Sequence, residues 1–506
     1  MPVTTLAGRP AASSGRIESN FRRGLVVASV LTILAASCYF ATMLWARNEL
    51  APPESVVAAQ SLMLAHDGTL YYDLNRYPYT VCAYMPVFYL LEAGLIRIGV
   101  PAPLGGRLIS FTALLGMIVL CGKLVFLYTQ DRYAAWCARL FAAVSPVLLN
   151  WGSIEQVDTL AYALSLGAFY FYSRHRVLGE GKLAVATALA VLATFTKQTA
   201  LAAPAAIFLL LCLRSGKKGL LFGAAWAGIV LAGALSINAA LGGRFLADTV
   251  FANMNPMSAA KLSGHLIQMG GATGGLLVLA AAGARNMLRG PASAPLVYLA
   301  LAGAMFLATA PKIGSDTNYQ IETTALLAVC AAIALSRLRF FELYFAGSKN
   351  WVTLLLLAAA VHVAVGCRVA MNTALFRAAM DKLHSAQVEG LQPYVAPQGG
   401  LVLSTDYNAM VRLRGRLDVE PLIYTLLVSA GKVDPEPVRR DLERGAFSTV
   451  ILGQDVFAGE NVTDLEIGTL PPALLQAVRK RYREAARVGV EGFETFVYQP
   501  ALGASN

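Results

Sequence analysis

The chain has 506 residues, of which 57% are hydrophobic and 14% charged, whereas a soluble domain carries about a quarter charged residues. This composition excludes an ordinary soluble domain and predicts a polytopic membrane protein, mainly α-helical because lipid offers the backbone no hydrogen-bond partners. The net charge of +11 lies in short Lys and Arg clusters between apolar runs, which indicates membrane topology rather than nucleic-acid binding.

About eleven apolar runs approach the roughly 20 residues that cross the hydrocarbon as a helix. The first follows Arg22 and Arg23 and is too long for a signal-peptide core, so we expect it to stay as a span. The expected spans are 24–45, 108–128, 134–150, 159–172, 183–195, 201–213, 220–241, 266–284, 294–310, 319–335 and 351–370.

The segment 84–100 is also apolar, but Glu92 and Arg97 interrupt it, so we expect a helix lying at the membrane interface. With this choice the basic clusters fall on one side of the membrane, as the positive-inside rule requires. The loop 46–107 and the tail 371–506 then lie on the opposite, outer side.

The tail alternates strand-like and helical runs that Gly and Pro separate. We therefore expect two parts: a transmembrane domain over 1–370, whose first outer loop carries interfacial helices, and a small extracytoplasmic α/β domain over 371–506. The expected strands are 401–404, 449–452 and 493–498, and the expected helices are 437–444 and 472–487.

Four charged side chains lie at or near the outer ends of the spans. Glu54 follows two prolines and is either a helix cap or a general base for a hydroxyl. Asp158 opens a span, where it can cap the helix or share a divalent cation with Glu54 through oxygen ligands. Lys197 either snorkels to the surface or holds a phosphate. Glu322 lies within an apolar run, where a charge is costly and is usually functional or paired.

Other polar residues of the outer segments are candidate substrate contacts. Tyr319 and Glu322 are three residues apart and share a helix face. Together with Glu322, the candidate substrate-binding residues are Asp73, Arg76, Tyr84, Gln198, Asn318 and Tyr319.

Missing features narrow the possible functions. The sequence has no P-loop motif, which argues against ATP-driven transport by this chain. The six cysteines in apolar runs and the lack of CxxC spacing indicate neither a zinc site nor a disulfide framework. The expected inner loops are too short for a nucleotide-binding domain, and the outer compartment normally lacks nucleotide sugars. A group transferred there needs a donor that arrives already activated, most simply in the membrane itself.

Four short motifs in the expected outer segments resemble those of the GT-C glycosyltransferases, which use polyprenyl-phosphate sugars. This family includes protein mannosyltransferases and the aminoarabinose transferases of lipid A, and the resemblance covers residues 22–370. The motifs are Glu54 followed by Tyr84-Met85-Pro86, Asp158 at the start of a span, Thr196-Lys197 before Pro204, and Asn318-Tyr-x-x-Glu322.

The resemblance implies an inverting glycosyltransferase of the hexosyl or pentosyl type, with Glu54 as general base and Lys197 as a donor-phosphate contact. It implies that Asp158 is a metal ligand or an acid that orients the substrate. Some members carry two neighbouring acids in the first loop, whereas Pro53 stands beside Glu54 here, which leaves a bound metal cation open. The implied partners are a polyprenyl-phosphate sugar, a lipid, glycan or protein acceptor, and the lipids of a bacterial inner membrane, with the active site facing the periplasm.

Two other functions are compatible with this pattern. Glu322 within a span would suit a transporter or lipid flippase, although we find no paired inverted halves. A glycan ligase with a lipid-diphosphate donor would share most of the same features.

Overall fold

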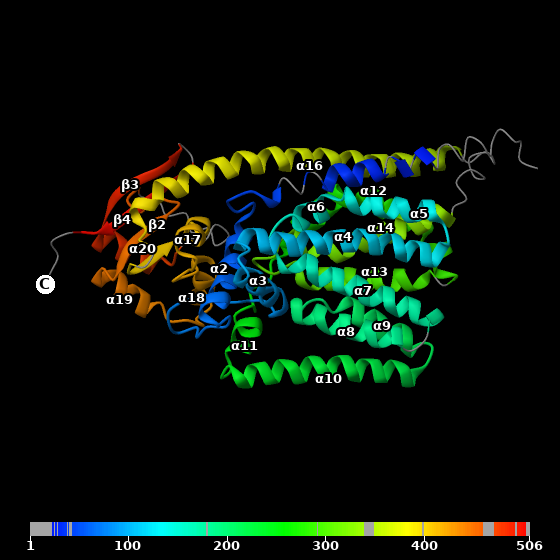
Figure 1. Ribbon diagram of the computed structural model, residues 1–506, viewed down its shortest axis with the longest axis horizontal. Helices are drawn as coiled ribbons and strands as arrows, with labels where there is room; N and C mark the ends of the chain where they lie inside the picture. Colours follow the sequence, from blue (N-terminus) through cyan, green and yellow to red (C-terminus); the bar gives the residue numbers. More distant parts are fainter. Residues whose placement is uncertain are drawn as a thin grey trace, which may run out of the picture.

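The computed structural model describes residues 43–178, 181–290, 292–337, 349–396, 399–458, 470–490 and 493–501, together with most of residues 23–39. Figure 1 shows a bundle of long helices joined to a small sheet, with the short helices α2, α3 and α11 between them. This is a multi-pass membrane fold, as the composition predicts.

Each expected span after the first overlaps helical structure, and the described residues between 23 and 44 are mostly helical as well. These elements are α4 (Ala102–Thr129), α5 (Arg132–Ala143), α6 (Pro146–Gly152), α7 (Val157–Leu178), α8 (Gly181–Thr196), α9 (Ala202–Cys212), α10 (Gly216–Ala240), α12 (Ala259–Leu288), α13 (Ser293–Thr309), α14 (Ile321–Arg337) and α16 (Lys349–Leu391).

Within the described ranges, five helical stretches are long and apolar enough to cross a membrane alone: those of α4, α10, α12, α14 and α16. The helices α8, α9 and α13 are apolar but shorter. The expected continuous span 134–150 is instead two helices, α5 and α6, that meet at 62°. Pro146 explains the break, because it has no N–H to continue the α5 ladder and its fixed φ suits the first position of a new helix.

The first outer loop folds into two helices. The first, α2 (Pro52–Asp67), carries Glu54 in its first turn, and the second is α3 (Val87–Arg97). At 11 residues, α3 is about half the length that crosses the hydrocarbon. The short elements α11 (Arg244–Leu246), the π-helix η1 (Ala247–Phe251) and the 3-10 helix η2 (Thr317–Gln320) complete this layer.

The tail contains a four-stranded sheet of order β1-β2-β4-β3, in which β1 and β2 are parallel and the other two pairs antiparallel. The expected boundary between residues 370 and 371 falls inside α16, which runs on to Leu391. The elements are β1 (Leu401–Ser404), α17 (Tyr407–Arg414), α18 (Pro421–Ser429), α19 (Glu436–Arg444), β2 (Phe447–Leu452), α20 (Pro472–Arg481), β3 (Tyr482–Val490) and β4 (Phe493–Pro500).

The expected helix 472–487 is correct only as far as Arg481. From Tyr482 onward the chain is strand β3, although its Ala, Arg and Glu residues favour a helix. Pairing with β4 overrides this local preference, and the Tyr482 hydroxyl donates to the Phe447 carbonyl at 3.1 Å, which anchors the strand to β2.

Candidate functional site

Three predicted site residues from separate segments meet at the end of the bundle. Asp158 lies in the first turn of α7, Lys197 directly follows α8, and Asn318 belongs to η2. Lys197 Nζ donates to Asp158 Oδ1, and Asn318 Nδ2 donates to the same oxygen at 3.0 Å. The Lys197 and Asp158 side chains are 1% and 0% exposed, so this is a buried ion pair.

Three tyrosines surround the Lys197 ammonium. Its Nζ lies 4.2 Å from the ring centre of Tyr319, 5.6 Å from that of Tyr84 and 5.7 Å from that of Tyr162. These are distances at which an aromatic face attracts a cation. Burial by itself lowers the pKa of Lys197, but the Asp158 carboxylate and the phenols hold it well above the ordinary lysine value. Lys197 therefore stays charged.

One carboxylate oxygen of Asp158 has no hydrogen-bond donor. This oxygen, Oδ2, is buried and accepts no hydrogen bond from any residue that the structure describes. The same holds for Asn318 Oδ1 and for Gln198 Oε1. A buried acceptor without a donor costs about 1–3 kcal/mol, which a polar ligand that donates to these oxygens would recover.

Glu322 lies deeper, on α14. Its Oε1 accepts a 2.5 Å hydrogen bond from the Tyr298 hydroxyl, and it is close enough to Lys197 for their charges to interact. The partners of Glu322 are thus the Tyr298 phenol, through a hydrogen bond, and the nearby Lys197 ammonium, through its charge.

Lys312 is a second cation at this site, and the sequence did not identify it. Its Nζ donates to the carbonyl of Asn253 at 3.1 Å and also to Asn253 Oδ1. The amides of Asn253 and Gln198 both donate to the carbonyl of Ala83, at 2.9 and 2.8 Å. Burial and the charge of Lys197 lower the pKa of Lys312 to about 8. The available sequence signal is its position in the same segment as Asn318, directly after Pro311.

Glu54 belongs to a neighbouring ion pair. Its Oε1 accepts from Arg107 Nε at 2.7 Å and from the Glu155 backbone N–H at 2.8 Å. Its Oε2 accepts from Arg107 Nη2 at 2.8 Å and from the Leu50 N–H at 2.6 Å. Among the described residues Glu54 makes no hydrogen bond or ion pair with Lys197, but it accepts from Glu155, three residues before Asp158.

Two further acids, Glu92 and Glu155, are buried beside this pair. Burial raises the pKa of Glu92 to about 8, and burial together with the charges of Glu92 and Glu54 raises the pKa of Glu155. The Ser61 hydroxyl donates to Glu92 at 2.7 Å. Both carboxyls therefore hold a proton more strongly than an exposed glutamate does.

Asp73 and Arg76 lie apart from the cluster. They face each other across 3.8 Å on the loop after α2, and their side chains are 46% and 83% exposed. Of the predicted substrate contacts, Tyr84 and Tyr319 lie against Lys197, Asn318 donates to its partner Asp158, and Glu322 interacts with its charge. Gln198 follows Lys197 in the chain and donates to the carbonyls of Ala83 and Thr249, and Asp73 and Arg76 lie apart.

No protein-family model matches the chain, and no curated protein sequence matches it. Solved structures do. The apo structure of ArnT from Cupriavidus metallidurans has a TM-score of 0.67 at 14% identity, over 93% of this chain and 97% of that one. The same protein bound to undecaprenyl phosphate gives 0.66 at 13%, over 94% and 98%. The apo oligosaccharyltransferase of Archaeoglobus fulgidus gives 0.54 at 13%, over 94% and 75%.

The chain has the GT-C fold. At these identities the likeness concerns the fold alone. Within this GT-C fold, the Asp158–Lys197 pair lies where α7, α8 and η2 meet the first outer loop, which supplies Tyr84.

The residues present do not fit the divalent cation that the sequence suggested between Glu54 and Asp158. Both oxygens of Glu54 accept from Arg107, and Asp158 Oδ1 accepts from Lys197 and Asn318. Over the described ranges, no three His, Cys, Asp or Glu side chains gather as a metal site. A buried cation thus lies beside each carboxylate, and of their four oxygens only Asp158 Oδ2 has no donor among the described residues, which is too few for a cation shared by the two.

Proposed function

We propose that the chain is a membrane glycosyltransferase that moves a sugar from a polyprenyl-phosphate donor to an acceptor hydroxyl. We place the reaction on the outer face of a bacterial inner membrane. The observation that carries the proposal is the buried Asp158–Lys197 pair with a spare carboxylate oxygen. The GT-C fold supports it, since the similar ArnT structure has undecaprenyl phosphate bound.

Lys197 and Lys312 would hold the donor phosphate together. The Lys197 ammonium is buried and that of Lys312 partly buried, and burial together with the charge of Lys197 lowers the pKa of Lys312 to about 8. A phosphate placed between them gains charge-assisted hydrogen bonds that are stronger than those between neutral groups. The two cations also stabilise the charge that grows on the phosphate as it leaves.

Asp158 would act as the general base. A phosphate beside Lys197 competes for its ammonium and frees the Asp158 carboxylate to accept a proton. The acceptor oxygen then attacks the anomeric carbon while its proton passes to Asp158. The bond from that carbon to the phosphate oxygen breaks, its electron pair stays on the polyprenyl phosphate, and a single displacement inverts the anomeric carbon.

The neighbouring polar groups would position the sugar and the acceptor. Asn318 Oδ1 and Gln198 Oε1 are buried acceptors suited to sugar hydroxyls, and Tyr84 and Tyr319 offer ring faces next to Lys197. Glu322 acts through its charge on Lys197. The exposed Asp73 and Arg76 are proposed acceptor contacts from outside the cluster.

Glu54 was the base predicted from the sequence. Because its oxygens already accept four hydrogen bonds, we propose instead that it positions Asp158 through the turn containing Glu155. A proton acceptor at Glu54 would first have to lose one of these donors.

The test is sugar transfer by the purified full-length protein in vesicles that contain polyprenyl-phosphate sugars. We expect Asp158→Asn to lower turnover by about 10²- to 10⁴-fold, the usual contribution of a general base. The matched control is Asp316→Asn, an exposed helix cap two residues before Asn318, which should keep its turnover. Unchanged turnover in Asp158→Asn would remove the proposed base.

The second lysine also favours an alternative function. A lipid diphosphate has more negative charge than a monophosphate, and the two ammonium groups of Lys197 and Lys312 would suit it as well. A glycan ligase with such a donor is therefore the second candidate. Offering both donors in the same vesicles separates the two, because the proposed enzyme turns over only the monophosphate-linked sugar.

A further inference from the structure

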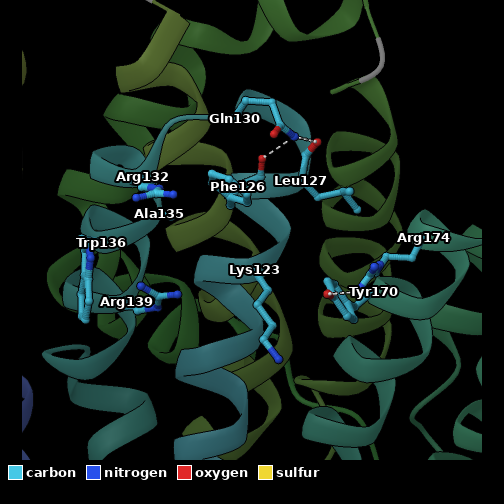
Figure 2. Close-up of a pocket in the computed structure, with 10 residues that line it drawn as sticks. All are labelled: Lys123, Phe126, Leu127, Gln130, Arg132, Ala135, Trp136, Arg139, Tyr170 and Arg174. Carbon is cyan, nitrogen blue, oxygen red and sulfur yellow. Dashed lines mark hydrogen bonds between the residues drawn. The ribbon is translucent and has the colours of Figure 1, made fainter. Parts of the chain in front are cut away.

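A basic cavity lies at the opposite end of the bundle from Lys197. It has a volume of about 510 Å³ between α4, α5 and α7, and Figure 2 shows its side chains coming from all three helices and the turn after α4. Its cations are Lys123, Arg132, Arg139 and Arg174. Since Arg174 follows Asp158 by 16 residues of the same helix, the two sites are about 24 Å apart along α7.

None of the four cations has a carboxylate partner among the described residues. Arg174 contacts the Tyr170 hydroxyl at 3.3 Å, and Lys123 lies 5.9 Å from the Tyr170 ring centre. Arg139 stacks 4.4 Å from the Trp136 ring centre. The adjacent acid, Asp131, caps α5 and accepts from the Ser336 hydroxyl at 3.1 Å, so it is engaged elsewhere.

The backbone makes room for one of these cations. A Cβ atom on Gly122 of α4 would clash with Arg139 Nε, so the guanidinium of α5 lies directly against the glycine of the neighbouring helix. Lys123 and Arg132 are exposed and Arg139 and Arg174 half-buried, and an anion bound among them would offset their mutual repulsion. The cavity therefore has the charge and the shape of an anion site.

The position of the cavity identifies the source of the anion. Val119 and Phe126 on α4 are 43% and 38% exposed and continue the cavity along an apolar face suited to acyl chains. Trp136 lies at the rim, where an aromatic ring suits the membrane interface. The positive-inside pattern assigns this end of the bundle to the cytoplasmic leaflet, which is rich in anionic lipid.

We propose that this cavity binds the phosphate headgroup of an anionic phospholipid of the inner leaflet, with Lys123 and Arg139 as its main contacts. The site is separate from the sugar-transfer site and does not depend on the proposed reaction. Its occupant would pin α4, α5 and α7 to one another at the end of the bundle remote from Lys197.

The test is a lipid titration of the full-length protein in mild detergent, followed by native mass spectrometry. Phosphatidylglycerol is compared with phosphatidylcholine, and inorganic phosphate is added in a separate arm. We expect phosphatidylglycerol to bind preferentially and Lys123→Gln to weaken it about fivefold, since one basic residue near an anionic surface contributes about 1 kcal/mol. The affinity of the Lys123→Gln/Arg139→Gln variant for phosphatidylglycerol should be about twenty-fivefold lower than that of the wild type if the two contributions add.

The matched control is Arg289→Gln, an exposed cation after α12 that lies outside the cavity, and it should leave the affinity unchanged. Lys123 is itself exposed, so its variant should fold even if Arg139→Gln does not. Equal binding of the two lipids, or equal affinity of wild type and Lys123→Gln, would overturn the proposal. Displacement of phosphatidylglycerol by millimolar inorganic phosphate would overturn the lipid assignment and make the free anion the ligand.

Discussion

The Glu54–Arg107 pair allows a positioning role to be separated from a catalytic one. In Glu54→Gln the side chain keeps its shape but loses its charge, and its NH₂ group then faces a donor, either Arg107 Nη2 or the Leu50 N–H. Removing one partner of a buried ion pair costs about 3–5 kcal/mol. Arg107 still donates to the carbonyls of Ala46 and Asn48, each at 2.6 Å, so we expect about 3 kcal/mol, the lower end of that range.

The assay is thermal unfolding of the purified protein in detergent, with sugar transfer measured on the same samples below the transition. We expect a clearly lower Tm for Glu54→Gln and a modest loss of turnover. Arg107→Met should also lower the Tm. The loss of stability in Glu54→Gln/Arg107→Met should be smaller than the sum of the losses in the two single variants, because the two side chains interact. An unchanged Tm with abolished turnover would refute this reasoning and restore Glu54 as the base.

The remaining predictions concern protons. Lys312→Gln should raise the KM for the donor more than it lowers kcat. The affinity of the wild type for the donor should fall as the pH rises above about 8, because Lys312 loses its charge there. A donor KM that is flat from pH 7 to 9 would exclude a contact between Lys312 and the phosphate. The wild-type Tm should fall as the pH rises from about 5 toward 8, because unfolded glutamates ionise near their ordinary pKa whereas burial raises the pKa of Glu92 to about 8. Glu155→Gln should flatten that slope, and an unaltered slope would show that the buried acid pair does not cause it.

Hydropathy predicted the helices because lipid requires a spanning segment to be helical, although α8, α9 and α13 are shorter than the roughly 20 residues expected of a span. It was insufficient at Pro146, where one apolar run becomes two helices at 62°, and at Tyr482, where pairing with β4 decides between helix and strand. Apolar composition reports burial in lipid, and it does not report the direction of a helix or the presence of a partner strand.

The same distinction applies to the site. Asp158, Lys197 and Asn318 could be predicted because each lies at the same end of the bundle, so the topology alone brings them toward one plane. Arg107 and Lys312 could not, because their importance comes from long-range partners: Arg107 binds an acid 53 residues earlier, and Lys312 contacts Asn253, 59 residues earlier. The position of Lys312 after Pro311, in the segment of Asn318, does not indicate its contact with Asn253.

The most direct test of the proposed site is an experimental structure of the full-length protein with undecaprenyl phosphate. We predict that the phosphate lies within hydrogen-bond distance, about 3 Å, of Lys197 Nζ and draws it away from Asp158. We also predict that Lys312 contacts the same phosphate. A lipid phosphate bound elsewhere, with the Asp158–Lys197 pair intact, would contradict the proposal.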